Sequence, residues 1–454
     1  MTKTIPNQRP VKVRSYFEFR KKTLTLLLLF VCCWLTVESE FLYSQSRFPK
    51  PEFESDYQQP RTTTPAPRHD FYEYLDSGML LIALILASFL ALKRRSRRGL
   101  FYLTIFSVIY FGFWRKGCIC SIGAIQNITL ALFDSNYVLP ISAIFFFIIP
   151  LIFTLFFGRT FCAAVCPLGA IQDLVALRPL KVPVWLQPVL TFIPYLYLGL
   201  AVLFAATGTT FLICRLDPFV GFFRLSASFQ MIIFGVSFLI LGIFVARPYC
   251  RFLCPYAVLL RWVSRLSKWH VSITPDDCIH CRLCEDACPY GAILEPTSEK
   301  LPESRSKSLR RLVLVVLLIP VLMGLFGFSL SQLHIPLSRM HPTVRLAEQI
   351  QLENTGKLEE TTLESRTFRG TGTPLSELFD TAFGIQQNFK SGGWILGAFL
   401  GFIFGLKIMS LSVPRQRMDY EPDRTECLSC GRCFEYCPRE HVRLKALKRR
   451  VSFL

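Results

Sequence analysis

The feature that most constrains this chain is a series of apolar blocks separated by polar or basic stretches. A helix that crosses a bilayer needs about 20 mainly apolar residues, because lipid offers no hydrogen-bond partner to free backbone groups. Hydrophobic residues make up 52% of the 454 residues. They gather at 23–37, 78–92, 100–114, 138–157, 189–214, 229–245, 312–330 and 393–411. The pattern predicts an all-α polytopic membrane protein with about eight transmembrane helices.

The distribution of basic residues predicts the orientation of these helices. A net charge of +19 also suits a nucleic-acid-binding protein, but in a membrane protein the Lys and Arg content of each loop reports topology first. Basic residues gather before the first block, at 93–98 and in the C-terminal tail, whereas 38–77 and 331–392 are not basic on balance. We therefore expect a multi-pass protein of the inner (cytoplasmic) membrane, with both termini cytoplasmic, lipid around it and no nucleic-acid partner.

The first block has two interpretations. A cleaved signal peptide would end at a small-x-small site, but none follows Val37, so a signal anchor is preferred. Seven segments are then expected in chain order. They are a cytoplasmic N-terminus with signal anchor (1–37), an extracytoplasmic linker (38–77), a transmembrane hairpin (78–115), a tandem membrane repeat (116–262), a first ferredoxin half (263–308), a transmembrane hairpin (309–412) with an outer loop at 331–392, and a second ferredoxin half with a basic tail (413–454).

Most of the 17 cysteines lie in closely spaced clusters. Two runs have the spacing C-x₂-C-x₂-C-x₃-C-P, in which three cysteines hold one cubane and the fourth ligates a second cluster. The first run is Cys278, Cys281, Cys284 and Cys288, and the second is Cys427, Cys430, Cys433 and Cys437. We therefore expect two [4Fe–4S] clusters. One is held by Cys278, Cys281, Cys284 and Cys437, and the other by Cys427, Cys430, Cys433 and Cys288.

Paired zinc knuckles are the alternative, but they fit a doubled run ending in Cys-Pro poorly. The runs lie 149 residues apart, from Cys278 to Cys427, with two predicted spans between them. Because a hairpin of spans returns the chain to the same side, we expect a cytoplasmic α+β dicluster-ferredoxin-like domain split across that hairpin. The returning span has a glycine every four residues from Gly393 to Gly405, which favours close helix packing.

A shorter cysteine pattern repeats inside the membrane region. GRTFCAAVCPLGA at 158–170 matches ARPYCRFLCPYAV at 246–258, at an offset of 88 residues. Each copy ends an apolar block with Cys-x-x-x-Cys-Pro. The membrane region is therefore expected to be a tandem repeat of cysteine-bearing helix pairs.

The two copies together supply four thiols. Residues four apart share one face of a helix, so two facing pairs would gather Cys162, Cys166, Cys250 and Cys254 into a third iron–sulfur or other metal centre at the inner membrane face. The alternative is that these cysteines are small packing residues. Arg247 and Arg251 are expected to anchor the helix end at the headgroups and to offset thiolate charge.

Five further cysteines have no such pattern. Cys118, Cys120 and Cys214 fall on or near the outer face, where a second metal centre, a redox-active pair and inert packing are all open interpretations. Cys32 and Cys33 lie in the first apolar block and are interpreted as packing residues.

The doubled Cys-x-x-x-Cys-Pro element together with two full ferredoxin runs resembles the NosR/NapH-type membrane polyferredoxins, and more distantly CcoG/FixG. The resemblance covers residues 114–443. It implies a membrane-embedded electron carrier that links a cytoplasmic or quinol donor to redox work across the membrane. NosR-like proteins carry an outer flavin domain with a Ser/Thr-Gly-Ala-Ser/Thr motif, whereas 38–77 is too short and lacks it. The resemblance therefore implies that FMN, if used, sits on a separate FMN-binding partner.

The functional prediction is electron transfer rather than stand-alone catalysis. No Gly-x-Gly-x-x-Gly follows a predicted strand, so the sequence indicates no nicotinamide site and no catalytic residue. We expect an electron-transfer subunit of an oxidoreductase system. Two alternatives stay in view: a membrane Cu(II) reductase, since soft thiolates suit Cu(I), and an iron–sulfur redox sensor.

Overall fold

The computed structural model describes most of the chain after residue 69. The described residues are 70–117, 120–177, 179–183, 185–225, 228–273, 278–297, 305–357, 361–370, 372–412 and 417–443. They are mostly helical, with one two-stranded sheet among them. The predicted signal anchor and most of the predicted outer linker lie outside the described residues.

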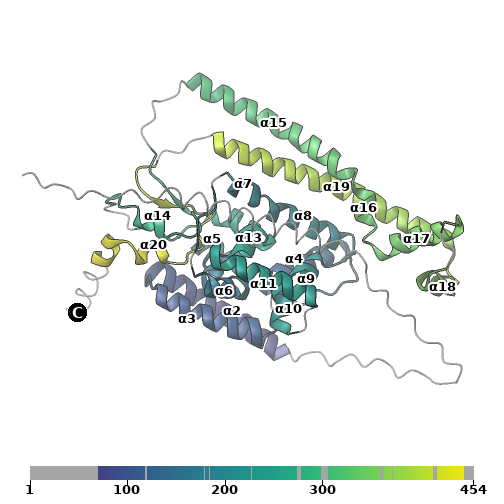
Figure 1. Ribbon diagram of the computed structural model, residues 1–454, viewed down its shortest axis with the longest axis horizontal. Coiled ribbons are helices and arrows are strands. Elements are labelled where there is room, and N and C mark those ends of the chain that lie inside the picture. The colour runs from purple at the N-terminus through teal and green to yellow at the C-terminus, as the bar shows by residue number, and fades with distance from the viewer. Residues whose placement is uncertain are drawn as a thin grey trace, which may run out of the picture. The chain divides into compact units, whose positions relative to one another are not determined.

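The central part of the molecule is built from helices packed side by side (Figure 1). In chain order they are α2 (Asp70–Ser88), η1 (Phe89–Lys93), α3 (Arg97–Ser107), η2 (Val108–Trp114), α4 (Ser121–Phe133), α5 (Ile141–Phe157), η3 (Phe161–Val165), α6 (Pro167–Val175), α7 (Gln187–Leu190), α8 (Ile193–Ala206), α9 (Leu212–Leu216), α10 (Pro218–Arg224), α11 (Phe229–Phe244), α12 (Pro248–Phe252) and α13 (Pro255–Ser264). Helix α5 contacts α2, α4 and α13, and α6 contacts α3, α11 and α12. The short helix α6 thus lies among both copies of the predicted repeat.

Several described helices are those of a membrane protein. Four stretches are long and apolar enough to cross a bilayer: Phe71–Lys93, Gln187–Ala206, Ser308–Ser331 and Leu375–Ser412. Helices α10 and α11 would add a fifth as a broken span, bent by 109°. Helices α4 and α5 are apolar but shorter. Every predicted block within the described residues is mainly helical, although 189–214 is interrupted between α8 and α9. The count of eight spans stays a prediction.

Helices α15 (Arg305–Ser331) and α19 (Leu375–Ser412) form an extended hairpin, seen side by side in Figure 1. The contact depends on glycine. A Cβ atom on Gly401 would lie 2.5 Å from the carbonyl oxygen of Leu322, and one on Gly397 would collide with the carbonyl oxygen of Phe326. The predicted glycine-mediated packing of this hairpin is therefore confirmed.

The predicted outer loop is folded into helices. They are α16 (His334–Ser338), α17 (Pro342–Asn354) and α18 (Leu363–Gly370), and they precede α19. Val344 and Ile350 of α17 pack against Leu378 of α19. The Glu353 carboxylate accepts hydrogen bonds from the backbone N–H of Thr362 and from the neighbouring α18 side chains, at 2.9 Å for Thr362. We call α16–α18 and the first turns of α19 the helical cap.

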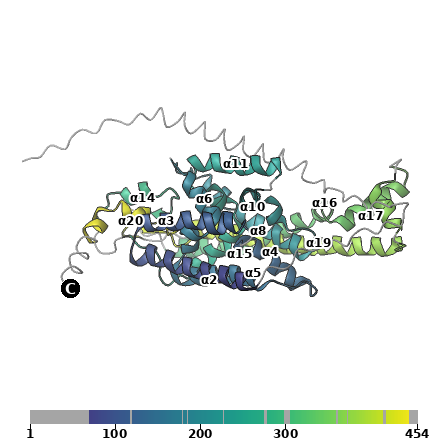
Figure 2. The same cartoon turned by 90° about the horizontal axis from the view of Figure 1, so that it is seen from below.

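The two ferredoxin runs lie together although the α15–α19 hairpin separates them in sequence. Strand β1 (Ile293–Leu294) pairs antiparallel with β2 (Glu421–Pro422), with Ile293 opposite Pro422. Helix α14 (Leu283–Ala287) contacts α20 (Arg432–Glu435), and both lie at the same end in Figure 2. The meeting of the two halves, which the hairpin argument predicts, is thus present in the structure.

Candidate iron–sulfur sites

The first set of thiols joins the two runs near the surface. Cys284 is buried and Cys281 is exposed. Burial raises the pKa of the Cys284 thiol to about 11, and the neighbouring Cys278, Cys281 and Cys437 raise it further. Cys437 belongs to the other run. The structure therefore brings together the four cysteines that the ferredoxin rule groups.

The second set surrounds a cavity. Cys288, Cys427, Cys430 and Cys433 all line it, together with Ile293 of β1. Burial raises the pKa of the Cys427 thiol to about 12, and Cys430 and Cys288 add to the rise. The N–H of Ala292 donates to Cys288 Sγ at 3.4 Å. A cavity walled by four thiols leaves space that a metal cluster would fill.

The backbone of both runs has a shape suited to an anionic cluster. His280 and Arg282 have φ values of +50° and +63°, and Ser429 and Gly431 have +53° and +79°. Left-handed residues in such loops turn successive N–H groups inward and form concavities that bind anions, iron–sulfur clusters included. Three of the four are not glycine, so this conformation is costly without a compensating ligand.

The spacing of the thiols argues against a single metal ion. Zinc bound at about 2.3 Å would hold its sulfur atoms within roughly 4.6 Å of one another. Among the described residues, only Cys278, His280 and Asp419 place all their ligand atoms within 4.8 Å, at a largely exposed position. No three sulfur atoms of either ferredoxin set are that close in the described chain. The residues therefore fit an iron–sulfur cluster better than zinc.

The Cys-x-x-x-Cys-Pro pairs meet in the central helices and form what we call the inner set. Cys162 lies in η3 and Cys250 in α12, while Cys166 and Cys254 directly precede α6 and α13. All four lie within electrostatic range of one another. The expectation that each pair shares one helical turn is wrong. Proline lacks an N–H and begins a new helix, so the second cysteine of each pair is extended.

Two residues of α6 shape the inner set. A Cβ atom on Gly169 would lie 3.6 Å from Cys250 Sγ. Gln172 donates from Nε2 to Cys250 Sγ at 3.4 Å, and its Oε1 accepts the N–H of Tyr249 at 3.0 Å. Hydrogen bonds to the sulfur stabilise its charged form.

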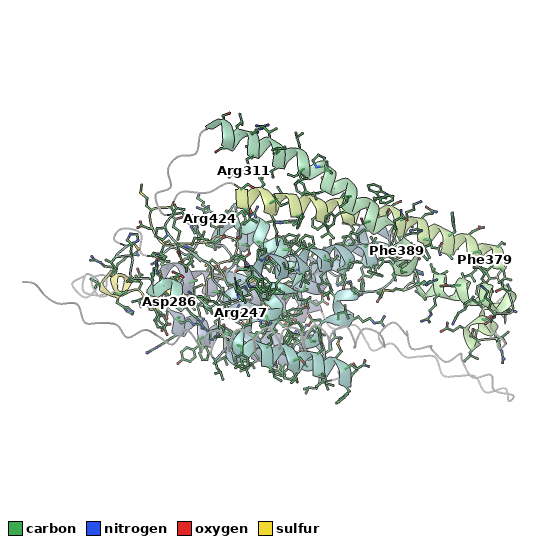
Figure 3. The ribbon with its side chains drawn as sticks, turned by 45° about the horizontal axis from the view of Figure 1, so that its top comes forward. Arg247, Asp286, Arg311, Phe379, Phe389 and Arg424 are labelled. Carbon is green, nitrogen blue, oxygen red and sulfur yellow. The ribbon has the colours of Figure 1, made fainter. Side chains whose placement is uncertain are left out.

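Arg247 is enclosed by protein rather than by headgroups. Its side chain is fully buried and lies among the central helices (Figure 3), and it donates to the carbonyl oxygens of Cys162 and Ala163, the latter at 2.9 Å. Arg251 is buried as well. The predicted headgroup anchoring is wrong for both arginines, because their side chains are buried inside the protein. Arg247 does lie within electrostatic range of Cys250, in agreement with the expected charge compensation.

One buried carboxylate holds these cations in place. Asp173 pairs with Arg97 at 3.1 Å, Arg247 at 3.3 Å and Arg432 at 3.8 Å, and accepts the Tyr290 hydroxyl at 3.2 Å. Burial alone would raise the pKa of this carboxyl, but the three arginines outweigh it and hold the pKa below its ordinary range. Asp173 therefore ties α3, α6, α12 and the second ferredoxin run into one charged cluster.

A single side chain bridges the inner set and the second ferredoxin set. Arg159, which is buried, donates to Cys162 Sγ at 3.8 Å and to the carbonyl oxygen of Thr425 at 2.9 Å. Thr425 lies two residues before Cys427. The two sets are therefore neighbours.

The comparisons with known proteins agree with this geometry. A family model described as a 4Fe-4S binding domain matches residues 139–184 and 228–274, which carry the inner set. Two further 4Fe-4S binding domain models match residues 271–294 and 424–440, which carry the ferredoxin runs.

Three relatives share this region. NosR of Stutzerimonas stutzeri is 27% identical over 244 residues, which is 48% of this chain and 33% of NosR. NirI of Paracoccus denitrificans is 32% identical over 152 residues, which is 31% of this chain and 22% of NirI. YccM of Escherichia coli, whose name describes it as a putative electron transport protein, is 28% identical over 158 residues. That is 31% of this chain and 43% of YccM. Over this region the chain resembles the NosR-type membrane-associated 4Fe–4S proteins.

The relatives, the 4Fe-4S domain matches and the apolar helices support iron–sulfur electron transfer at a membrane. The chain matches less than half the length of each of these three relatives. No solved structure matches the chain.

The described structure includes only some of the remaining cysteines. Cys120 directly precedes α4, and Cys214 lies in α9 within electrostatic range of it. Cys118, Cys32 and Cys33 lie outside the described residues.

Sequence reasoning missed two residues around the inner set, Gln172 and Asp173. One signal was available for the first: Cys-x-x-Gly-Ala-Ile-Gln occurs at 120–126 and again at 166–172. For Asp173 no local signal exists, because its partners come from three separate segments.

Proposed function

We propose that this protein relays single electrons between a cytoplasmic or quinol donor and an extracytoplasmic partner. The two ferredoxin sets would hold [4Fe–4S] clusters, and the inner set a third centre. Such clusters supply one-electron redox chemistry when bound. A separate FMN-binding protein is the outer partner that we propose, since flavins exchange single electrons with iron–sulfur centres.

One observation carries this proposal: three thiol sets succeed one another from an exposed end to a buried one. Cys281 is exposed, Cys430 and Cys433 are buried, and the inner set is reached next through Arg159. An electron carrier needs an accessible entry and an insulated interior. This succession supports relay better than catalysis at any one set.

No observation in the described structure favours copper reduction at the Cys-x-x-x-Cys pairs. The Cu(II) reductase therefore stays an alternative that rests on the sequence, since soft thiolates suit Cu(I).

The test is electron transfer across a sealed membrane. The full chain, purified without oxygen, is reconstituted into vesicles with FMN trapped inside, and dithionite is added outside. We expect trapped FMN to bleach at a rate that falls at least tenfold in Cys250→Ala and in Cys433→Ala. Each variant should also lose about four iron atoms per chain relative to wild type.

Cys32→Ser is the matched control, because this cysteine belongs to no proposed set. It should keep both the iron content and the bleaching rate of wild type. Equal bleaching by wild type and Cys250→Ala, in vesicles shown to be sealed, would overturn the relay through the inner set.

A further inference from the structure

The cysteines of the outer side are built into the structure in the same way as the inner set. Cys120 and Cys166 each begin a Cys-x-x-Gly-Ala-Ile-Gln segment and each precedes a helix, α4 or α6. The sulfur of Cys120 accepts the N–H of Gly123 at 3.4 Å, and Cys166 receives the N–H of Gly169 in the same way. The first half of the inner set therefore has a structural copy.

The second half of the inner set is copied as well. Gln126 Oε1 accepts the N–H of Ile213 at 3.0 Å, as Gln172 Oε1 accepts that of Tyr249 at 3.0 Å. In both places the next residue along the chain is a cysteine.

The glycines confirm that these next cysteines occupy equivalent positions. A Cβ atom on Gly123 would lie 3.5 Å from Cys214 Sγ, and one on Gly169 would lie 3.6 Å from Cys250 Sγ. The arrangement of Cys120 and Cys214 around Gly123 thus matches the arrangement of Cys166 and Cys250 around Gly169.

A buried carboxylate completes this outer group. Asp217 is 1% exposed, and its Oδ1 accepts the N–H groups of Phe219 at 2.9 Å and Val220 at 3.4 Å. Its Oδ2 has no hydrogen-bond partner among the described residues. Asp217 lies within electrostatic range of both Cys120 and Cys214. An unpaired buried carboxylate oxygen is costly, and a metal ligand bond would remove that cost.

A second buried polar atom points to the same place. Gln126 is fully buried and its Nε2 has no partner within the described chain, whereas Nε2 of the equivalent Gln172 donates to Cys250 Sγ. The Tyr249 hydroxyl lies beside Asp217, and neither this hydroxyl nor Asp217 Oδ2 meets the distance and angle of a hydrogen bond within the described chain. The outer group therefore holds unsatisfied polar atoms where the inner set has satisfied ones.

We propose that Cys120, Cys214 and Asp217 are ligands of an outer [4Fe–4S] cluster. Thiolates and carboxylates both bind metals in their deprotonated forms. A single ion does not fit, because these three groups do not lie within 4.8 Å of one another in the described structure.

The location of the outer group suits the last position of a relay. A cavity lies between the two membrane sets and is lined by both Cys120 and Cys166. Cys214 is exposed. The assignment of this site as the point where electrons leave rests on the proposed function, whereas the presence of the cluster does not.

The test counts iron and acid-labile sulfide in the full chain purified without oxygen, and records the electron paramagnetic resonance spectrum after dithionite reduction. Wild type is expected to hold about sixteen iron atoms, and Cys214→Ala about twelve. Cys250→Ala should also hold about twelve iron atoms. The paramagnetic resonance signal that it loses should differ from the signal that Cys214→Ala loses. Cys32→Ser is the control and should match wild type.

The Asp217→Asn variant distinguishes a metal-ligand role of Asp217 from a purely structural role as a helix cap. The amide oxygen can still accept the Phe219 and Val220 N–H groups, so a purely structural Asp217 predicts an unchanged spectrum. A ligand role predicts an altered or missing outer signal in Asp217→Asn, and retained iron with a shifted signal in Asp217→Cys. Wild-type iron and spectrum in both Cys214→Ala and Asp217→Asn would overturn the proposal.

These measurements need no partner and no electron flow across the membrane. Failure of the vesicle assay with intact outer iron would therefore remove the proposed function and leave the outer cluster standing. The signals of the three other centres report whether each variant is folded.

Discussion

The Asp173 carboxylate offers the sharpest test of how this structure is held together. Asp173→Asn keeps the size of the side chain and its acceptor for Tyr290, but removes the charge that faces Arg97, Arg247 and Arg432. The guanidinium of Arg247 is 0% exposed and has no access to water. The variant therefore leaves a buried cation without its carboxylate.

The magnitude follows from the burial of each pair. Removing one partner of a buried ion pair costs about 3–5 kcal/mol, and the Arg247–Asp173 pair falls in that class, with side chains 0% and 2% exposed. Arg97 and Arg432 are 14% and 20% exposed and add less, because water partly replaces the lost carboxylate. We expect a loss of about 3–5 kcal/mol in the free energy of unfolding, or roughly two to four powers of ten in the equilibrium constant.

The assay is equilibrium unfolding in detergent without oxygen, followed by tryptophan fluorescence and by cluster absorbance. Glu348→Gln is the matched control, because it makes the same carboxylate-to-amide change in a pair with Arg339 whose side chains are 55% and 38% exposed. That variant should lose less than about 1 kcal/mol. A loss in Asp173→Asn no larger than in the control would refute the assignment of Asp173 as the central buried counter-ion.

Two further predictions concern the α15–α19 hairpin and the helical cap. Gly397→Ala should destabilise the hairpin by about 1–3 kcal/mol, because the new Cβ meets backbone, whereas Gly384→Ala, with no neighbour within 4 Å, should be neutral or stabilising in the same unfolding assay. Hydrogen bonds, first from Ser365, lower the pKa of Glu353, so its contribution to stability is present at neutral pH and is lost as pH falls below the ordinary glutamate range of about 4.3. Protease resistance of the cap should therefore be nearly constant in wild type from pH 7 to about pH 4.3, fall below that pH, and depend less on pH in Glu353→Gln; identical profiles would contradict this role.

The sequence predicted the grouping of the ferredoxin cysteines because that grouping is encoded by local spacing. Three cysteines within seven positions must lie on one loop, and the proline after the fourth turns it away from them. The structure brings Cys437 to Cys284 and Cys288 to Cys427, as that rule requires. The doubled Cys-x-x-x-Cys-Pro element likewise predicted that four thiols would meet.

The sequence erred where a residue's role depends on what packs around it. A helical face was expected for each Cys-x-x-x-Cys pair, but the following proline begins a new helix and the pair straddles a break. Arginines near an apolar block suggested headgroups, whereas Arg247 is buried against Asp173. Net charge and hydropathy do not predict which basic side chain will be buried in an ion pair with an acidic one.

The sequence by itself determined the chemistry of this protein, because thiol spacing and apolar block length act locally along the chain. Tertiary structure decided which distant groups share each site. Asp173 gathers arginines from three segments, and Asp217 stands beside Cys120 although 97 positions separate them. Such contacts form only when the helices pack against one another. Burying a charged group is costly in free energy, and the partners that offset this cost come from distant parts of the chain that no local sequence pattern identifies.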